Sequence, residues 1–171
     1  MIRIERLSEQ DITFAQGELV MLLKEAVDGG ASMSFIAPLD YDMAANFWAK
    51  VAREVTTGER IVLAAYADNK LVGSVQLVPA PQPNAPHRAE VQKLLVLVKY
   101  RQQGIATLLL HSIEETARAL GHTLIVLDTV RDSPAERLYE KAGYQRAGII
   151  PQFAFRRAGE LLDTVIFYRL L

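Results

Sequence analysis

The sequence predicts an α/β (α+β) domain in which a mixed sheet carries helices on both faces. Segments with the two-residue hydrophobic period of strands and segments with the helical period follow one another along the chain. Their order is strand, two helices, three strands, helix, strand, helix and two strands. The 171 residues are enough to bury a sizeable core, so we expect residues 1–171 to form one domain.

The expected strands are short segments rich in apolar and β-branched residues, with turn residues at their ends. They cover residues 2–6, 61–67, 71–78, the segment from Arg88 that precedes Arg101, 123–129, 144–150 and 161–171. Asp68-Asn69-Lys70 is a hairpin signature, and Ala158-Gly159 is expected to turn between the last two strands. The four-proline stretch 79–86 is expected to be an extended connection within one sheet.

The helices are predicted from cap residues that flank segments of helical period. Ser8 with Asp11 resembles a capping box, and Pro134 suits a first helical turn. The expected helices lie between Ser8 and Gly29-Gly30, Asp40 and Gly58, Ala106 and Gly121, and Asp132 or Ser133 and Gly143.

Composition excludes several classes of function. Charged residues make up 23% of the chain and the formal net charge is −1, so neither disorder nor a nucleic-acid partner is expected. The absence of cysteine excludes disulfides, thiolate metal sites and a cysteine nucleophile. His87, His111 and His122 lack the spacing of metal ligands, so no metal is expected. No apolar run approaches about 18 residues and no signal peptide is recognisable, which predicts a cytoplasmic protein without membrane contact.

The most informative segment runs from Arg88 to Thr107, where an apolar strand leads through a loop into an amphipathic helix. A helix start leaves its first N–H groups unpaired and carries about half a positive charge, so this loop is suited to bind an anion. Gly104 has no Cβ and would let a phosphate approach the backbone. The alternative is that Gly104 only eases the turn from strand to helix.

Residues 101–106 fit the Arg/Gln-x-x-Gly-x-Gly/Ala signature of the GNAT-superfamily acetyltransferases, and residues 135–144 resemble that family's A-x-x-L-Y-E-K-x-G-F/Y element. The resemblance implies the GNAT fold, with a mixed, mostly antiparallel central sheet of about seven strands, and acetyl-CoA as co-substrate. Asp132 stands where the family often has Asn, so no cofactor contact is predicted for it. The implied cofactor-binding residues are Leu94, Leu95, Val96, Arg101, Gln102, Gln103, Gly104, Ile105, Ala106 and Thr107, with the pyrophosphate on 102–107.

A narrower resemblance lies partly outside these motifs. Residues 29–35, 88–94 and 127–129 are similar to the tabtoxin-resistance acetyltransferases, which acetylate an amino-acid-like β-lactam toxin. The first segment connects the two early helices, a region that varies with the acceptor in the family. The similarity implies an amino-acid-like acceptor and a role in toxin or antibiotic resistance, although a related enzyme could keep this loop and take another amino acid or a small peptide.

Two carboxylates are candidates for the base. A primary amine with a pKa of about 10 is protonated near neutral pH, so acetyl transfer to it needs one. Glu90 lies on the strand before the cofactor loop, where the family often carries a base, and Asp128 lies at the carboxyl end of the next strand. If these strands are adjacent and parallel, Asp128 stands at the mouth of the site. The alternatives are that Glu90 pairs with Arg88 or Lys93 and that Asp128 caps a turn.

The remaining roles follow from the family resemblance. Tyr139 is implied to be the general acid toward the departing thiolate, and a backbone N–H in residues 94–96, where family strands carry a bulge, to hold the developing oxyanion. Phe35 is predicted to contact the acceptor together with Glu90 and Asp128. Core packing is the alternative for both aromatic residues. Arg156-Arg157 is interpreted as a solvated hairpin tip, with contact to an acidic acceptor group as the alternative.

The sequence therefore favours an acetyl-CoA-dependent N-acetyltransferase that acts on the primary amine of a small amino-acid-like molecule. The alternatives are a transferase for a peptide or protein amino terminus and a coenzyme A-binding module without catalysis. Whether Glu90 or Asp128 is the base, and whether the chain forms a homodimer, stay open.

Overall fold

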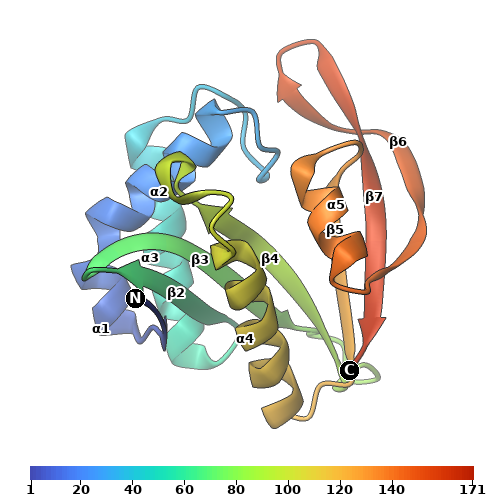
Figure 1. Cartoon of the computed structure of the whole chain (residues 1–171), viewed down its shortest axis with the longest axis horizontal. Helices are drawn as coiled ribbons and strands as arrows, with labels where there is room; N and C mark the ends of the chain where they lie inside the picture. Colours follow the sequence, from blue (N-terminus) through green and yellow to red (C-terminus); the bar gives the residue numbers. More distant parts are fainter.

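A seven-stranded sheet runs through the computed structural model, which describes residues 1–171 (Figure 1). The strands are β1 (Ile2–Arg6), β2 (Ile61–Ala67), β3 (Lys70–Pro79), β4 (Arg88–Val96), β5 (Leu124–Val130), β6 (Gln145–Arg157) and β7 (Glu160–Leu170). Their order in the sheet is β1-β2-β3-β4-β5-β7-β6. Only β4 and β5 are parallel, and all other neighbours are antiparallel. The predicted mixed, mostly antiparallel sheet is confirmed.

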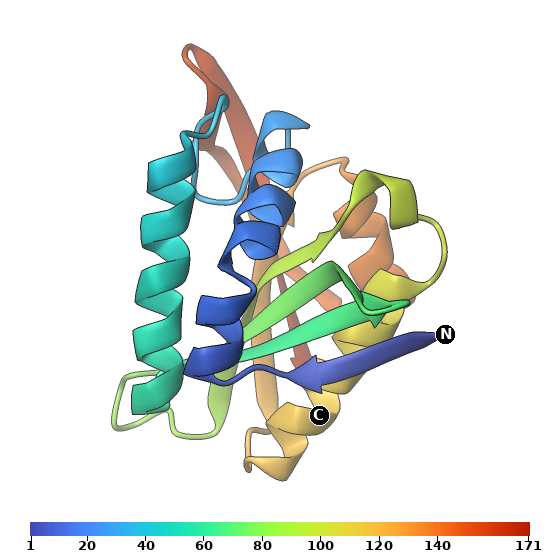
Figure 2. The same cartoon turned by 90° about the vertical axis from the view of Figure 1, so that its left-hand side faces the viewer.

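Helices cover both faces of the sheet, as predicted (Figure 2). One face carries α1 (Glu9–Phe14), α2 (Gln16–Asp28) and α3 (Tyr41–Thr57), and the other carries α4 (Ile105–Ala119) and α5 (Pro134–Lys141). The first three helices pack on the sheet around the fully buried Trp48, whereas α4 and α5 pack around Phe167. A short 3₁₀ turn, η1 (Val98–Tyr100), links β4 to the loop before α4.

The single helix expected between Ser8 and Gly29 is two helices, which corrects the prediction. The capping box at Ser8 forms as expected, because Ser8 Oγ accepts from the Asp11 N–H at 3.2 Å and Asp11 Oδ2 accepts from the Ser8 N–H at 2.8 Å. The chain leaves the helical conformation at Ala15, where ψ is 12°. Gly17, with its low helix propensity, follows two residues later, so little local preference holds the two segments in one straight helix.

The other caps agree with the sequence. Asp40 accepts a hydrogen bond from the Met43 N–H at the start of α3, and Ser133 accepts one from the Glu136 N–H at the start of α5. The β2–β3 turn places Asp68 and Asn69 at φ 48° and 64°, a conformation that Asp and Asn tolerate better than most residues.

The sheet divides between β4 and β5. The two strands pair at only three positions, Arg88–Leu124, Ala89–Ile125 and Glu90–Val126, and diverge beyond them (Figure 1). β4 also carries a bulge on its other side, because Ser74 pairs with Leu95 and Gln76 with Gln92, so that Val75 of β3 faces two residues of β4, Lys93 and Leu94. Lys93 has a left-handed backbone, with φ 52°. The divergence and the bulge together place the candidate site.

None of the helices is long and apolar enough to cross a membrane. The extent of the domain, residues 1–171, stays a prediction.

Candidate active site

The loop from Arg101 to Gly104 presents unpaired backbone N–H groups at the start of α4. Gly104 caps the helix with φ 80° and no side-chain hydrogen bond, and the first intrahelical bond runs from the Leu108 N–H to the Gly104 carbonyl at 3.0 Å. The N–H groups of residues 105–107 have no acceptor within the protein. A Cβ built on Gly104 would meet no atom within 4 Å. Open space in front of unpaired N–H groups fits a pyrophosphate.

Two side chains of this loop donate hydrogen bonds to nearby backbone carbonyl groups. Arg101 Nε donates to the Val96 carbonyl at 3.1 Å, and Gln103 Nε2 donates to the Lys99 carbonyl at 3.4 Å. Arg101–Gly104 and Thr107 are exposed, whereas Leu95 and Ile105 are buried in the core. The predicted cofactor residues thus lie in two segments, the end of β4 and the loop and first turn of α4, which η1 connects.

Gly73, a residue that was not predicted from the sequence, supports the end of β4 and its contact with α4. A Cβ at Gly73 would stand 2.7 Å from the Leu95 carbonyl oxygen and 3.1 Å from Leu109 Cδ1. Only glycine therefore lets β3 lie this close to the β4 bulge and to α4. The signal in the sequence was a glycine inside a strand pattern, which often marks a close backbone approach.

Glu90 and Asp128 lie on one face of the sheet. Glu90 pairs in parallel register with Val126, and strand alternation puts Asp128 on the same face as Val126. This is the face that carries α1–α3, because Ala89 and Ile125, which point the other way, pack with α4 and α5. Glu90 is partly buried and Asp128 is exposed.

Neither carboxylate has the structural role considered as its alternative. No ion pair joins Glu90 to Arg88 or Lys93, and Arg88 instead donates to Gln82 Oε1 at 3.1 Å. The cap of α5 is Ser133, so Asp128 does not fill that position. The hydroxyl of Thr164 on β7 lies 3.0 Å from Asp128 Oδ2. Asp128 thus has one side-chain partner, Thr164, and neither carboxylate forms an ion pair.

Tyr139 points its ring into the core between α5 and the sheet. The ring lies 5.6 Å from that of Tyr144 and 6.1 Å from that of Phe167, so it contributes to packing. Burial raises the pKa of the Tyr139 hydroxyl well above its ordinary value, and the nearby Asp128 carboxylate raises it further. The hydroxyl is therefore protonated at neutral pH, which is the state that a general acid needs.

Two aromatic residues and a lysine lie near Glu90 and Asp128, on the side of the sheet that carries α3. Phe35 contacts Phe47 edge to face with ring centres 5.5 Å apart. Lys93 Nζ lies 5.7 Å from the centre of the Phe47 ring and 3.4 Å from Ser34 Oγ. Burial lowers the pKa of Lys93, Arg60 lowers it further, and Asp128 and Glu90 act in the opposite direction. Lys93 therefore lies near enough to Glu90 and Asp128 for their charges to act on it, although the sequence suggested it only as an ion-pair partner.

The β6–β7 hairpin closes this side of the site against the loop between α2 and α3. The Ala37 N–H donates to the Arg156 carbonyl at 3.4 Å, and the Arg156 side chain lies against Gly30. Arg156 is only partly exposed, pairs with Glu160 at 3.4 Å and has a buried Nε without an acceptor. The interpretation of a solvated tip is thus wrong for Arg156, because the α2–α3 loop covers it.

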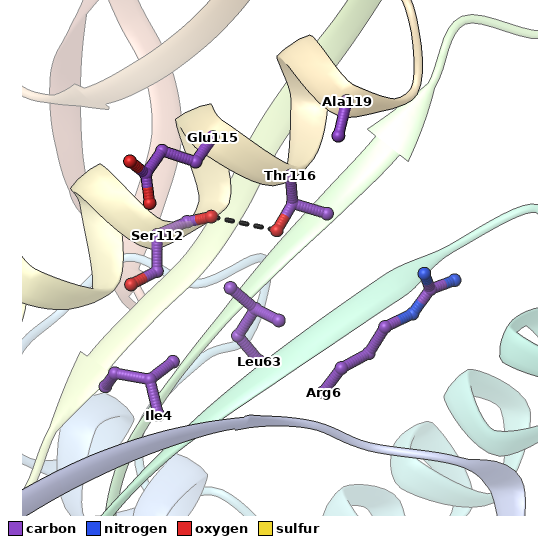
Figure 3. Close-up of a pocket in the computed structure, with 7 residues that line it drawn as sticks. All are labelled: Ile4, Arg6, Leu63, Ser112, Glu115, Thr116 and Ala119. Atoms are coloured by element: carbon purple, nitrogen blue, oxygen red, sulfur yellow. Dashed lines mark hydrogen bonds between the residues drawn. The ribbon is translucent and has the colours of Figure 1, made fainter.

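A separate hollow of about 380 Å³ lies between β1, β2 and α4 (Figure 3). It is lined by Ile4, Arg6, Leu63, Ser112, Glu115, Thr116 and Ala119. None of the predicted site residues borders it. The structure contains no cluster of three or more His, Cys, Asp or Glu side chains that could hold a metal ion.

Comparison with known proteins agrees with this geometry. Residues 31–144 match the model of the acetyltransferase (GNAT) family. An uncharacterised N-acetyltransferase encoded in the hisH-hisA intergenic region of Azospirillum brasilense is 30% identical over 106 residues. The matched segment spans 61% of this chain and 61% of that relative, which is less than two thirds of either.

Solved structures share the fold at low sequence identity. A Salmonella typhimurium structure determined with its cofactor acetyl-CoA has a TM-score of 0.80 and 16% identity, covering 100% of this chain and 94% of that one. A structure assigned as a phosphinothricin N-acetyltransferase has a TM-score of 0.80 and 18% identity, covering 100% and 99%. None of these matches separates the tabtoxin-resistance enzymes from other members. The predicted fold and family are confirmed: the chain belongs to the acetyltransferase (GNAT) family.

Proposed function

We propose that this chain transfers the acetyl group of acetyl-CoA to the primary amine of a small amino-acid-like molecule. The observation that carries the proposal is the placement of Glu90 and Asp128 on one face, where β4 and β5 diverge, together with the unpaired N–H groups of α4 after the loop that follows β4. Two carboxylates and an anion-binding helix start supply a base and a cofactor site.

The N–H groups of residues 105–107 are the donors proposed for the pyrophosphate, and the β4 backbone at 94–96 borders the part of the cofactor that carries the acetyl group. Bound there, acetyl-CoA supplies an acetyl thioester. A backbone N–H of residues 94–96 donates to the carbonyl oxygen as negative charge develops on it. These groups hold the reacting carbon in place without moving.

The proton balance uses both kinds of acid–base group. The acceptor ammonium loses one proton to Glu90 or Asp128, directly or through water, and the free amine forms the new N–C bond. The C–S bond breaks as Tyr139 donates its proton to the departing thiolate, and the second proton lost by the nitrogen returns through water to Tyr139. The buried, protonated phenol of Tyr139 supports this assignment.

A small acceptor is favoured over a folded protein because two segments meet over the acceptor side. The α2–α3 loop contacts the β6–β7 hairpin through Ala37, Gly30 and Arg156, and Phe35 lies on the same loop. A peptide or protein amino terminus would need an open groove here. The similarity of residues 29–35 to the tabtoxin-resistance enzymes supports a role in toxin or antibiotic resistance.

The test is acetyl-CoA turnover, followed by thiol release, over a panel of amino acids, amine antibiotics and peptides. Small zwitterionic amines should be acetylated and protein lysines should not. The Glu90→Gln variant should lose rate most at low pH, where the amine is most fully protonated. A higher specificity constant for a peptide amino terminus would overturn the small-amine assignment, and no thiol release with any amine would favour the non-catalytic module. A cytoplasmic location and a homodimer stay predictions.

A further inference from the structure

Lys93 holds an unusual position in the candidate site. It is one of the two bulge residues of β4 and has a left-handed backbone conformation at φ 52°, which residues other than glycine rarely adopt. The bulge turns its ammonium toward the α2–α3 loop and α3, where it meets Ser34 and the ring of Phe47. Lys93 therefore faces the acceptor side and directly precedes residues 94–96, whose backbone is proposed to border the acetyl group.

The Lys93 ammonium has few partners for a partly buried charge. Of its three N–H groups, one reaches Ser34 Oγ at a long 3.4 Å, and the ring of Phe47 lies beside it. No carboxylate lies within 4.0 Å of it. Arg60, a second cation that acts on Lys93, is already paired with Glu54 at 2.6 Å. Burying a charge without a contacting counter-ion costs free energy. An anionic group of a ligand placed next to Lys93 would offset this cost.

The charges of Glu90, Asp128 and Lys93 are complementary to those of a zwitterion, which carries one ammonium and one anionic group. Glu90 and Asp128 are near enough to Lys93 to influence its ionisation but do not contact it. A ligand whose ammonium lies at the carboxylates therefore has a cation available for a neighbouring negative group. An amine without such a group leaves Lys93 unpaired.

We propose that Lys93 binds the carboxylate of the acceptor and selects α-amino acids, or molecules with an equivalent anion beside the amine, over simple amines. This inference rests on the proposed function, because it names the recognition element of the same acceptor site. Lys93 acts here as a binding residue. The alternative is that Lys93 serves only to balance the charge of Glu90 and Asp128.

The experiment compares an amino acid with its own carboxamide, which keeps the amine and the size but removes the negative charge. The pair is taken from the best amino-acid substrate in the thiol-release panel. The wild type should prefer the acid by about ten- to a hundredfold in kcat/KM, as expected for a hydrogen bond to a charged group. The Lys93→Met variant should lose this preference, because its kcat/KM should fall much further for the acid than for the carboxamide. The Lys93→Arg variant should keep most of the preference.

The acid-to-amide ratio is measured within one variant, so partial loss of folded enzyme does not alter it. Lys70→Met, at the exposed β2–β3 turn, is the matched control and should keep the wild-type ratio. Equal turnover of acid and amide by the wild type, or an equal loss on both in Lys93→Met, would overturn the inference and leave the acetyltransferase intact. Absence of thiol release from the wild type with any amine would instead refute the proposed function itself.

Discussion

Asp128 is held by a residue of another strand. The Thr164 hydroxyl lies 3.0 Å from Asp128 Oδ2 and 2.9 Å from the Thr129 carbonyl oxygen, and Thr164 itself is buried. Since a hydroxyl has one proton, these two acceptors share it. β7 therefore fixes the orientation of a carboxylate that β5 leaves exposed.

Replacing Asp128 by Asn should raise the KM for the amine far more than the KM for acetyl-CoA, because only the amine is a cation that the carboxylate attracts. Steady-state kinetics with each substrate varied in turn measures the two constants. Thr164→Val should give a smaller effect in the same direction. Asp68→Asn, in the exposed β2–β3 turn, is the control and should change neither constant. An equal rise in both constants for Asp128→Asn would remove Asp128 from the amine site.

Gly104→Val should abolish most of the affinity for coenzyme A. A branched side chain there would fill the open space before the unpaired N–H groups of α4 and would strain a residue at φ 80°. Gly121→Val is a close match, since that glycine has φ 85° and also meets no atom within 4 Å, but lies at the other end of α4. Calorimetry should find coenzyme A binding lost only in the first variant. Unchanged affinity in folded Gly104→Val would place the pyrophosphate elsewhere.

Tyr139→Phe should reduce kcat about 10- to 1,000-fold while the affinity for both substrates persists, as expected for the loss of a general acid. Tyr144→Phe provides the control, because Tyr144 is also buried and its ring lies 5.6 Å from that of Tyr139, yet it lies outside the proposed mechanism. Wild-type turnover in Tyr139→Phe would leave this tyrosine with packing alone.

The same two tyrosines should make the protein sensitive to alkaline pH. Burial is the largest cause that raises the pKa of both, with Asp128 adding to it at Tyr139 and Glu114 at Tyr144. The folded state thus holds these protons more tightly than the unfolded state. Their contribution to the free energy of unfolding is complete below about pH 10 and is lost as pH rises above it. Urea denaturation should show a smaller loss from neutral to alkaline pH in Tyr144→Phe than in the wild type.

Gly73→Ala should destabilise the protein by about 1–3 kcal/mol and raise the KM for acetyl-CoA. The new methyl group would stand 2.7 Å from the Leu95 carbonyl, so the β4 bulge must shift to admit it. Gly148→Ala in β6, where a Cβ meets nothing within 4 Å, is the matched strand control. A Gly73→Ala protein with wild-type denaturation and kinetics would show that the bulge does not depend on this contact.

The sequence predicts local features well here and tertiary ones poorly. The cap at Ser8, the β2–β3 turn and the helix start at Gly104 follow from residues that are neighbours in the chain, and all three are confirmed. The hydrogen bond from Thr164 joins residues 36 positions apart and depends on the order of the strands. The position of the Lys93 side chain depends on a register shift between β3 and β4, which the residues of the strand do not predict.

Only three residue pairs join β4 to β5, and beside them the His87 carbonyl accepts from the Thr123 and Leu124 N–H groups, so little backbone pairing connects β1–β4 to β5–β7. A molecule bound where these strands separate would contact both parts and add cohesion that the sheet lacks by itself. Its binding free energy would be lost on unfolding and would thus count toward stability. Amide hydrogens along the separated edges of β4 and β5 should exchange with solvent readily in the free protein and slowly in the saturated one.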